Sequence, residues 1–254
     1  MSPNTTRLAG RTALVTGSTG GLGVAIAKAL AAEGALAVVS GRDKGRGDAV
    51  VADIRAAGGR AEFVAADLGA GGAQVRALAD GALAAAGGRI DILVNNAATW
   101  SLPEPTAEIT EEALLESYRT NVVAPFLLTG ALVPAMAERG EGAVVNIGSI
   151  NGLIGGDKSA LYGSTKAAVH SLTKSWAAEY GPLGVRVNTV APGPIGTERV
   201  LEIADHIAPT LERIPSRRMS TPEEVAAAVV FLAGASAANI HGAVLSVDGG
   251  WAAV

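Results

Sequence analysis

The chain of 254 residues contains no cysteine, which excludes disulfides, thiolate catalysis and zinc sites built on cysteine. Aromatic residues make up only 4% of the chain, so its core must be built from Ala, Val, Leu and Ile. The three histidines, His170, His206 and His241, are widely separated and lack metal-ligand spacing. We therefore expect no metal site.

Runs of basic residues and long apolar segments are also absent. The net charge is -4, and no basic cluster of the kind that contacts phosphate backbones stands out. No apolar run approaches the ~20 residues that span a bilayer, and residues 1–10 are polar, unlike a signal peptide. We expect no nucleic-acid partner, no membrane association and a cytoplasmic location.

Small apolar residues and glycine, of which there are 33, dominate a pattern of short β-rich runs that alternate with longer Ala/Leu-rich segments. Strands are predicted at residues 12–16, 35–40, 61–66, 90–95, 143–147, 185–190 and 243–247. Helices are predicted at residues 21–33, 43–57, 74–86, 110–138, 160–180 and 222–232. Thr221 is the expected N-cap of the last helix, and Pro125 is expected to kink the long one.

The predicted strands are apolar runs rather than alternating patterns, which favours burial on both faces. Strand–helix alternation along the whole chain predicts an α/β fold: one doubly wound, Rossmann-type domain over residues 1–254, with a seven-stranded parallel sheet flanked by helices. Residues 193–220, with prolines at 194, 209 and 215, are the least regular stretch. We predict a mobile segment over a site there, with a plain surface excursion as the alternative.

A glycine-rich turn, Thr16 to Gly23, follows the first strand and opens directly into a helix. Backbone N–H groups and the helix dipole favour an anion there, so the turn predicts a phosphate site. Its framework glycines are Gly17, Gly21 and Gly23, and their spacing differs from the usual G-x-G-x-x-G.

Three further strand ends carry polar residues. Arg42 follows the second strand, where an arginine accommodates a ribose 2′-phosphate, and Asp43 beside it is interpreted as the helix N-cap. Asp67 ends the third strand, where it either accepts from an adenine amino group or caps a turn before Gly69. Asn95 ends the fourth strand. Its side chain could either contact the cofactor or tie neighbouring strands together, and the sequence favours neither.

Tyr162 and Lys166 are four residues apart on a predicted helix and therefore share a face. A nearby cation lowers the pKa of a phenol, and the Ser149 hydroxyl could hold a substrate oxygen while Tyr162 moves the proton. The three side chains suit general acid/base chemistry on a carbonyl/alcohol pair, which needs a hydride partner.

Together these segments resemble the short-chain dehydrogenase/reductase family over nearly the whole chain, from about residue 8 to 251. The resemblance depends on the joint order and spacing of motifs, since each is unspecific alone. The motifs are residues 16–23, Asp67-Leu68, residues 95–98, Asn121, Ser149, residues 162–166, residues 192–197 and residues 247–250.

The resemblance implies an NAD(P)-dependent oxidoreductase that acts on a small carbonyl or alcohol substrate, with NADP(H) preferred and NAD(H) possible. It implies a catalytic set in which Tyr162 is the acid/base, Lys166 lowers its pKa and holds the nicotinamide ribose, Ser149 binds the substrate oxygen, and Asn121 positions a relay water. It implies cofactor contacts at Gly17, Ser18, Thr19, Gly21, Leu22, Gly23, Arg42, Asp67, Leu68, Asn95, Ala97, Tyr162, Lys166, Pro192, Gly193, Ile195 and Thr197. It also implies a homotetramer or dimer.

Some alternatives stay open at this stage. Asn121 could instead satisfy a helix kink near Pro125. Candidate substrate-pocket residues, against ordinary local packing, are Trp100, Leu102, Ile150, Leu153, Ile154, Ile203 and Ile207. The rival functions are a cofactor-binding sensor or scaffold without turnover and an elimination chemistry without a nucleotide. The complete catalytic set disfavours the first rival, and the intact glycine-rich turn disfavours the second.

Overall fold

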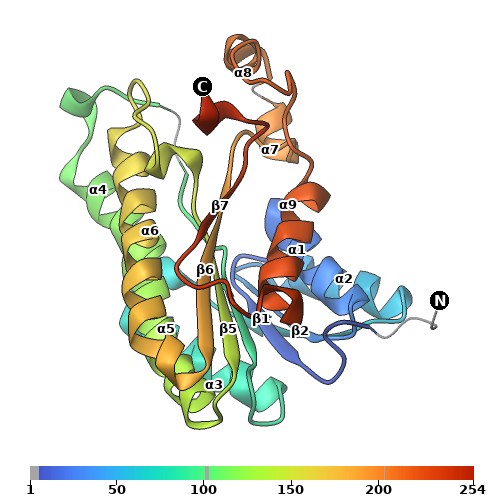
Figure 1. The fold of residues 1–254 in the computed structure, drawn as a ribbon. Helices are drawn as coiled ribbons and strands as arrows, with labels where there is room; N and C mark the ends of the chain where they lie inside the picture. Colours follow the sequence, from blue (N-terminus) through green and yellow to red (C-terminus); the bar gives the residue numbers. More distant parts are fainter. Residues whose placement is uncertain (1–5, 101–102, 203) are drawn as a thin grey trace.

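A computed structural model describes residues 6–100, 103–202 and 204–254. Within them, seven strands form one parallel sheet in the order β3-β2-β1-β4-β5-β6-β7, which confirms the predicted fold class (Figure 1). The strands are β1 (Thr12–Val15), β2 (Leu36–Gly41), β3 (Arg60–Ala65), β4 (Ile92–Asn95), β5 (Gly142–Ile147), β6 (Val185–Pro192) and β7 (Val244–Val247). The strand order reverses between β1 and β4, which is where folds of this kind bind ligands.

Helices cover both faces of the sheet (Figure 1). One face carries α1 (Gly21–Ala32), α2 (Lys44–Ala56) and α9 (Pro222–Ala233), and the other carries α3 (Gly72–Ala85), α5 (Ala124–Glu138) and α6 (Ala160–Tyr180). Each face has its own cluster of buried aliphatic side chains. The sheet is therefore buried on both sides at its centre, as the apolar strand runs predicted.

The two edge strands depart from that prediction. Only Ala61 is buried in β3, and β7 has no fully buried residue. An edge strand has one neighbour instead of two, and the flanking helices reach it less completely. Apolar composition alone did not distinguish these strands from the central ones.

The long helical stretch predicted for residues 110–138 is divided in three. After α4 (Glu111–Tyr118) comes a π-helical turn, η3 (Arg119–Val123), and then α5. The irregularity thus lies just before Pro125 rather than at it, because a proline is tolerated in the first turn of α5. The turn contains Asn121, whose side chain is buried.

By length and hydropathy, residues 111–138 would suffice to cross a bilayer, so the expectation that no apolar run approaches that length was wrong. In this fold Leu128, Leu132, Val133 and Met136 of that stretch pack into the aliphatic cluster on their face of the sheet. Packing against the strands thus accounts for the buried part of this apolar stretch, while Val123 and Phe126 are exposed.

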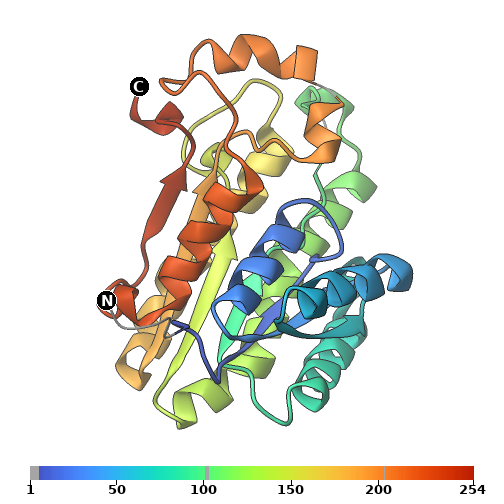
Figure 2. The ribbon, with the colours of Figure 1, turned by 90° about the vertical axis from the view of Figure 1, so that its right-hand side faces the viewer.

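Residues 193–220 are more regular than the sequence suggested. They contain α7 (Glu198–Leu201) and α8 (Ala204–Leu211), and Ile195 pairs with Ser220 in an isolated β-bridge. Figure 2 shows these helices at the top of the molecule, above the carboxyl ends of the strands. Pro209 lies within α8, so a proline there does not prevent a helix, and the mobility of this segment stays a prediction.

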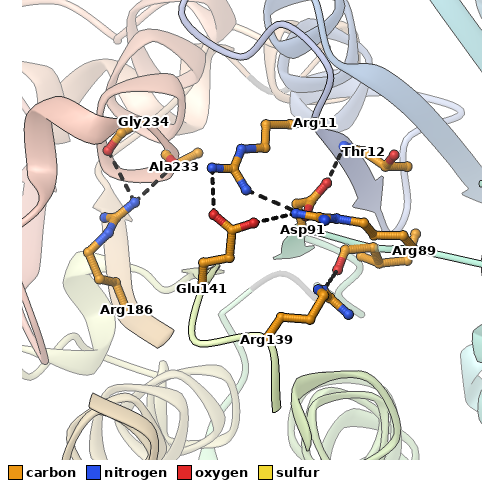
Figure 3. Close-up of polar contacts among 10 residues, drawn as sticks. Arg11, Thr12, Arg89, Asp91, Arg139, Glu141, Arg186, Ala233 and Gly234 are labelled. Atoms are coloured by element: carbon orange, nitrogen blue, oxygen red, sulfur yellow. Dashed lines mark hydrogen bonds and ion pairs between the residues drawn. The ribbon is translucent and has the colours of Figure 1, made fainter. Parts of the chain in front are cut away.

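The amino ends of the central strands are held by an ion-pair network (Figure 3). The Asp91 carboxylate, almost fully buried, accepts from the Arg89 side chain at 2.5 Å and from the Thr12 backbone at 3.0 Å. Glu141 accepts from Arg11 at 2.8 Å and from Arg89. The network ties together the starts of β1, β4 and β5, so it fixes the central strands at the end away from the cleft described next.

Candidate active site

A cleft of about 820 Å³ opens at the carboxyl ends of the strands, over the point where the strand order reverses. It is lined by the glycine-rich turn, the ends of β2, β3 and β4, and the α4 region. Its predicted members are Gly17, Thr19, Leu22, Gly23, Arg42, Asp67, Leu68 and Ala97. Residues not predicted from the sequence as cofactor contacts include Thr99, Trp100, Glu112, Glu116, Arg119, Thr120 and Arg199.

The glycine-rich turn has room for a phosphate because its glycines carry no side chains. Gly17 has a φ of +63°, and a methyl group there would lie 2.8 Å from the Ala97 Cα. A methyl group at Gly23 would lie 2.3 Å from the Gly17 carbonyl oxygen. The chain therefore passes too closely for any other residue, and the start of α1 is left open to an anion. These features fit the pyrophosphate of a dinucleotide.

Two residues that sequence reasoning passed over hold this turn in place. The Thr16 hydroxyl accepts from the backbone N–H groups of Asn96 and Ala97, both at 3.0 Å. The Asn96 side chain donates to the carbonyls of Thr16 and Gly17 at 2.8 and 3.1 Å. The position of Asn96 directly after a strand end could have indicated this role, but the sequence reasoning assigned roles only to its neighbour Asn95.

Nine predicted cofactor residues do not line this cleft: Ser18, Gly21, Asn95, Tyr162, Lys166, Pro192, Gly193, Ile195 and Thr197. Two of them, Asn95 and Ser18, are buried beneath the turn. Asn95 is buried and donates to the Asn146 side chain at 2.9 Å, which is the tie between neighbouring strands that the sequence left open. Ser18 is fully buried, where its hydroxyl donates to the Val15 carbonyl at 2.7 Å and accepts from the Ser40 backbone at 2.9 Å. Both side chains brace the turn from within the fold.

The ends of β2 and β3 carry the polar residues that the sequence indicated. Asp43 caps α2, where its carboxylate accepts from the Arg46 backbone at 3.0 Å, as preferred from the sequence. Arg42 is exposed and lines the cleft. Asp67 also lines the cleft while it caps a short turn through Gly69 at 3.0 Å, so the capping alternative is realised.

Helix α6 brings Tyr162 and Lys166 together beside Ser149. The Lys166 ammonium lies 5.5 Å from the centroid of the Tyr162 ring and donates to the Ile147 carbonyl at 2.8 Å. Ser149 lies two residues after the end of β5, where its hydroxyl accepts from the Asn151 backbone at 3.2 Å. The fold therefore gathers a phenol, an ammonium and a hydroxyl at one place.

The chain alone does not show the lowered phenol pKa that the sequence suggested. Burial raises the pKa of Tyr162 to about 12, while a hydrogen bond with Ser149 acts in the opposite direction. Burial also lowers the pKa of Lys166 to about 8. Lys166 binds a backbone carbonyl rather than the phenol, so desolvation outweighs its influence on Tyr162.

Asn121 connects the cleft to α6. Its side chain donates to Thr165 at 3.1 Å and to the Thr99 carbonyl at 3.0 Å, and it accepts from the Thr99 backbone at 2.7 Å. Thr99 lines the cleft, and Thr165 precedes Lys166 in the chain. The π-helical turn thus directs this amide toward the loop after β4 instead of toward Pro125.

The segment after β6 lies over the glycine-rich turn. A methyl group at Gly21 would lie 3.6 Å from Thr197 Cγ2, and the Gly193 backbone donates to the Val247 carbonyl at 3.1 Å. Farther along, the Arg199 guanidinium lies 5.0 Å from the centre of the Trp100 ring and donates to the Trp100 carbonyl at 3.3 Å. This pair joins α7 to the loop after β4 at the cleft.

The candidate substrate-pocket residues separate into different environments. Ile150 is 1% exposed and belongs to the core, which is the local-packing alternative that the sequence left open. Trp100 lines the cleft, Leu153 is 45% exposed, and Ile154 and Ile207 are partly buried. Leu102 and Ile203 lie outside the described residues. Among those described, no group of three or more metal-ligating side chains occurs.

Comparison with known proteins identifies the family. The family model described as enoyl-(acyl carrier protein) reductase matches residues 17–252. The chain is 35% identical over 244 residues to a 3-oxoacyl-(acyl carrier protein) reductase of Vibrio cholerae, covering 96% of this chain and 98% of that protein. It is 39% identical over 247 residues to a D-threitol dehydrogenase of Mycolicibacterium smegmatis, covering 96% and 94%.

Comparison with solved structures points to the same family. A short-chain dehydrogenase/reductase family protein is 43% identical and superposes with a TM-score of 0.89, covering 98% of this chain and all of the other. A structure from Beutenbergia cavernae, described as a candidate NAD(P)-dependent gluconate 5-dehydrogenase with bound NADP, is 38% identical with a TM-score of 0.92, covering 99% and 100%.

The chain belongs to the short-chain dehydrogenase/reductase family. It is an oxidoreductase of the NAD(P)-dependent class, which transfers a hydride between a nicotinamide and a carbonyl or alcohol. The non-catalytic sensor or scaffold is not favoured by these relatives.

Proposed function

We propose that the protein is an NADP(H)-preferring oxidoreductase of small ketones and secondary alcohols, with Tyr162 as its acid/base. The carrying observation is that α6 places the Tyr162 phenol beside both the Lys166 ammonium and the Ser149 hydroxyl. No metal-ligand cluster competes for this chemistry among the described residues. A phenol can donate its proton to a forming alkoxide, and burial keeps the Tyr162 phenol protonated in the chain alone.

The residues around the cleft fit a nicotinamide dinucleotide. Gly17 and Gly23 would leave space for its pyrophosphate, Asp67 and Leu68 of the cleft wall would hold its adenine end, and Thr197 beside Gly21 would cover the phosphates. When bound, the cofactor would supply or accept the hydride, and its oxidised form would add a positive charge to the site.

Each member of the catalytic set has a separate role in this proposal. Ser149 donates to the substrate oxygen and orients it toward the phenol. Tyr162 gives its proton to that oxygen during reduction and takes it back during oxidation. Lys166 stabilises the phenolate and holds ribose hydroxyls, while Asn121 orders a water that passes protons toward Lys166.

The preference for NADP(H) is supported by the two charged residues that follow β2. Arg42 lines the cleft, whereas the Asp43 carboxylate is engaged in capping α2 and does not line it. A guanidinium is well suited to a 2′-phosphate, while a carboxylate would bind a free 2′-hydroxyl.

Cofactor titrations test that preference. We expect Arg42→Ala to weaken NADPH binding about 10- to 100-fold, the loss of one or two charge-assisted hydrogen bonds, and to leave NADH binding nearly unchanged. Arg46→Ala is a matched control, since Arg46 is an exposed residue of α2 outside the cleft. Equal weakening of both cofactors would contradict the role of Arg42.

A substrate panel tests the reaction. It should contain a 3-oxoacyl ester, a tetritol and a cyclic hydroxy acid, because relatives of this chain are named for such compounds, and simple ketones as the least demanding substrates of the proposed reaction. Turnover is followed through the absorbance of the reduced cofactor. Binding of neither cofactor, or no turnover with any member, would contradict the proposed activity.

The proposal includes self-association and a cytoplasmic location. Leu114, Leu115, Val123 and Phe126 of the α4–α5 region are each more than 40% exposed, which is unusual for large apolar side chains on one stretch. Light scattering should give a tetramer or dimer for the wild type and a smaller particle for Phe126→Asp. A monomeric wild type would contradict this part.

The proposal also treats residues 1–254 as one domain, in which residues 193–220 form a movable cover over the cleft. The Arg199–Trp100 contact supports this assignment, because it joins the cover to the opposite wall.

A further inference from the structure

His170 is a buried titratable residue that the proposed chemistry does not use. It lies on α6, four residues after Lys166, and is only 5% exposed. Its ring points beneath the turn that carries Ser149, where Nε2 accepts a long hydrogen bond of 3.5 Å from the Ser149 backbone N–H.

The turn around Ser149 is shaped to admit this ring. A methyl group at Gly148 would lie 2.2 Å from His170 Nε2. One at Gly152 would lie 2.7 Å from the Lys166 carbonyl carbon and 2.8 Å from His170 Cε1. Neither glycine has a positive φ, so the need for glycine comes from close approach, of the imidazole at Gly148 and of both the α6 backbone and the imidazole at Gly152.

The neutral ring is the form that can accept from Ser149. Burial lowers the pKa of His170 to about 4, Lys166 and Lys174 act in the same direction, and the Gly152 backbone opposes them. The proton of the neutral imidazole then lies on Nδ1, because Nε2 is the acceptor. The ring therefore stays uncharged beside the Lys166 ammonium at neutral pH.

An imidazole is a costly way to fill this part of the core. Nδ1 makes no hydrogen bond of standard geometry within the described residues, although the Gly152 backbone lies close enough to favour the protonated ring, so this buried polar atom is poorly satisfied. An aliphatic side chain would avoid that cost. What the imidazole supplies, and an aliphatic group does not, is an acceptor for the Ser149 backbone.

We propose that His170 is a positioning residue that holds the Ser149 backbone from below, so that the Ser149 hydroxyl stays directed toward Tyr162 and the substrate oxygen. The Ser149 backbone is extended, with φ -166° and ψ 155°, and its hydroxyl is held by Asn151. The Gly148 backbone donates to the Val190 carbonyl at 2.8 Å, so His170 supplies the next anchor along the turn. This role rests on the proposed function of Ser149.

Two variants separate the effect of the His170 hydrogen-bond acceptor from the effect of its side-chain packing. His170→Leu fills the space without an acceptor, whereas His170→Gln keeps a neutral side-chain oxygen. We expect His170→Leu to lower kcat by about 10-fold or more while the dissociation constant for NADPH stays within about twofold, and we expect His170→Gln to recover most of kcat. Amide hydrogen exchange in residues 148–150 should accelerate in His170→Leu and much less in His170→Gln.

A double-mutant cycle supplies the second criterion. If His170 acts through Ser149, the loss caused by His170→Leu should largely disappear in the Ser149→Ala background. An unchanged kcat in His170→Leu, an equal loss in both backgrounds, or a parallel loss of NADPH binding would overturn the proposal. If His170→Leu does not fold, His170→Met is judged by the same criteria.

The controls distinguish this inference from the proposed function. Wild-type turnover and its loss in Ser149→Ala are measured first, and absence of either refutes the proposed function together with the role of His170. Normal wild-type behaviour with an unaffected His170→Leu refutes the role of His170 alone.

Discussion

Replacement of Gly23 by alanine is expected to destabilise the protein even before a cofactor binds. Gly23 is the third residue of α1, and the added methyl group would lie 2.3 Å from the Gly17 carbonyl oxygen and 2.7 Å from both Ser18 Cα and Asn96 Nδ2. Two of these three neighbours are backbone atoms, which cannot rotate away. The turn itself must therefore move.

The size of the effect follows from two opposing contributions. Overpacking costs about 1–3 kcal/mol, and the backbone contacts place this site at the upper end of that range. Alanine is favoured over glycine within a helix by about 1 kcal/mol, which offsets part of the cost. The net loss is about 2 kcal/mol, which for a chain of this size lowers Tm by about 4–8 °C.

Thermal unfolding without cofactor measures this loss, and Gly20→Ala is the matched control in the same turn. Gly20 has an extended backbone, with φ -167° and ψ 163°, and a methyl group there has no described neighbour within 4 Å. We expect this control to stay within about 0.5 kcal/mol of the wild type. A Gly23→Ala protein that melts with the control would refute the packing argument.

Three further predictions concern charges and contacts away from this turn. Lys166 has a pKa of about 8 in the folded chain against 10.5 ordinarily, so the unfolded chain binds this proton more tightly. Between pH 8 and 10 the unfolding free energy of the wild type should therefore rise with pH relative to that of Lys166→Met. Denaturant titration at several pH values measures this difference. Arg11 and Arg89 lower the pKa of Glu141 to about 2, so the contribution of Glu141 to the unfolding free energy should be present above about pH 4.5 and be lost as the pH falls toward 2. Glu141→Gln should remove this pH dependence. Its effect on the unfolding free energy at pH 7 should be below about 1 kcal/mol, because the carboxylate is 42% exposed. Arg199→Ala removes the contact with Trp100, so it should raise amide hydrogen exchange in residues 193–202. It should also speed cofactor release about 2- to 10-fold in stopped-flow measurements. Unchanged exchange would contradict the role of this contact.

The order of strands and helices was predictable because it is written in local patterns. Apolar runs bounded by polar residues gave each of the seven strands, and the capping box formed by Thr221 and Glu224 marks the start of α9. Two helices, α7 and α8, were missed because prolines and charged residues obscure their short periodic segments. The π-helical turn was missed because the contact that Asn121 makes from it, with Thr165, spans 44 residues and leaves no mark in the local pattern.

The candidate site was predictable as a set of residues but not as a set of contacts. Spacing on one helix face placed Tyr162 and Lys166 together, and the glycine-rich turn located the phosphate end of the cleft. Ser18 and Asn95 make hydrogen bonds inside the fold with residues 22 and 51 positions away in the chain. No local sequence pattern contains such partners. The raised pKa of Tyr162 likewise depends on burial by the whole fold.

The most direct test of the account compares wild-type and Tyr162→Phe proteins in NADPH binding and in turnover with the best substrate of the panel. The phenylalanine keeps the ring and removes only the hydroxyl that transfers the proton. The account predicts a loss of kcat of about 100-fold or more, with NADPH binding within about twofold of the wild type. Turnover close to that of the wild type would contradict the assignment of Tyr162 as the acid/base.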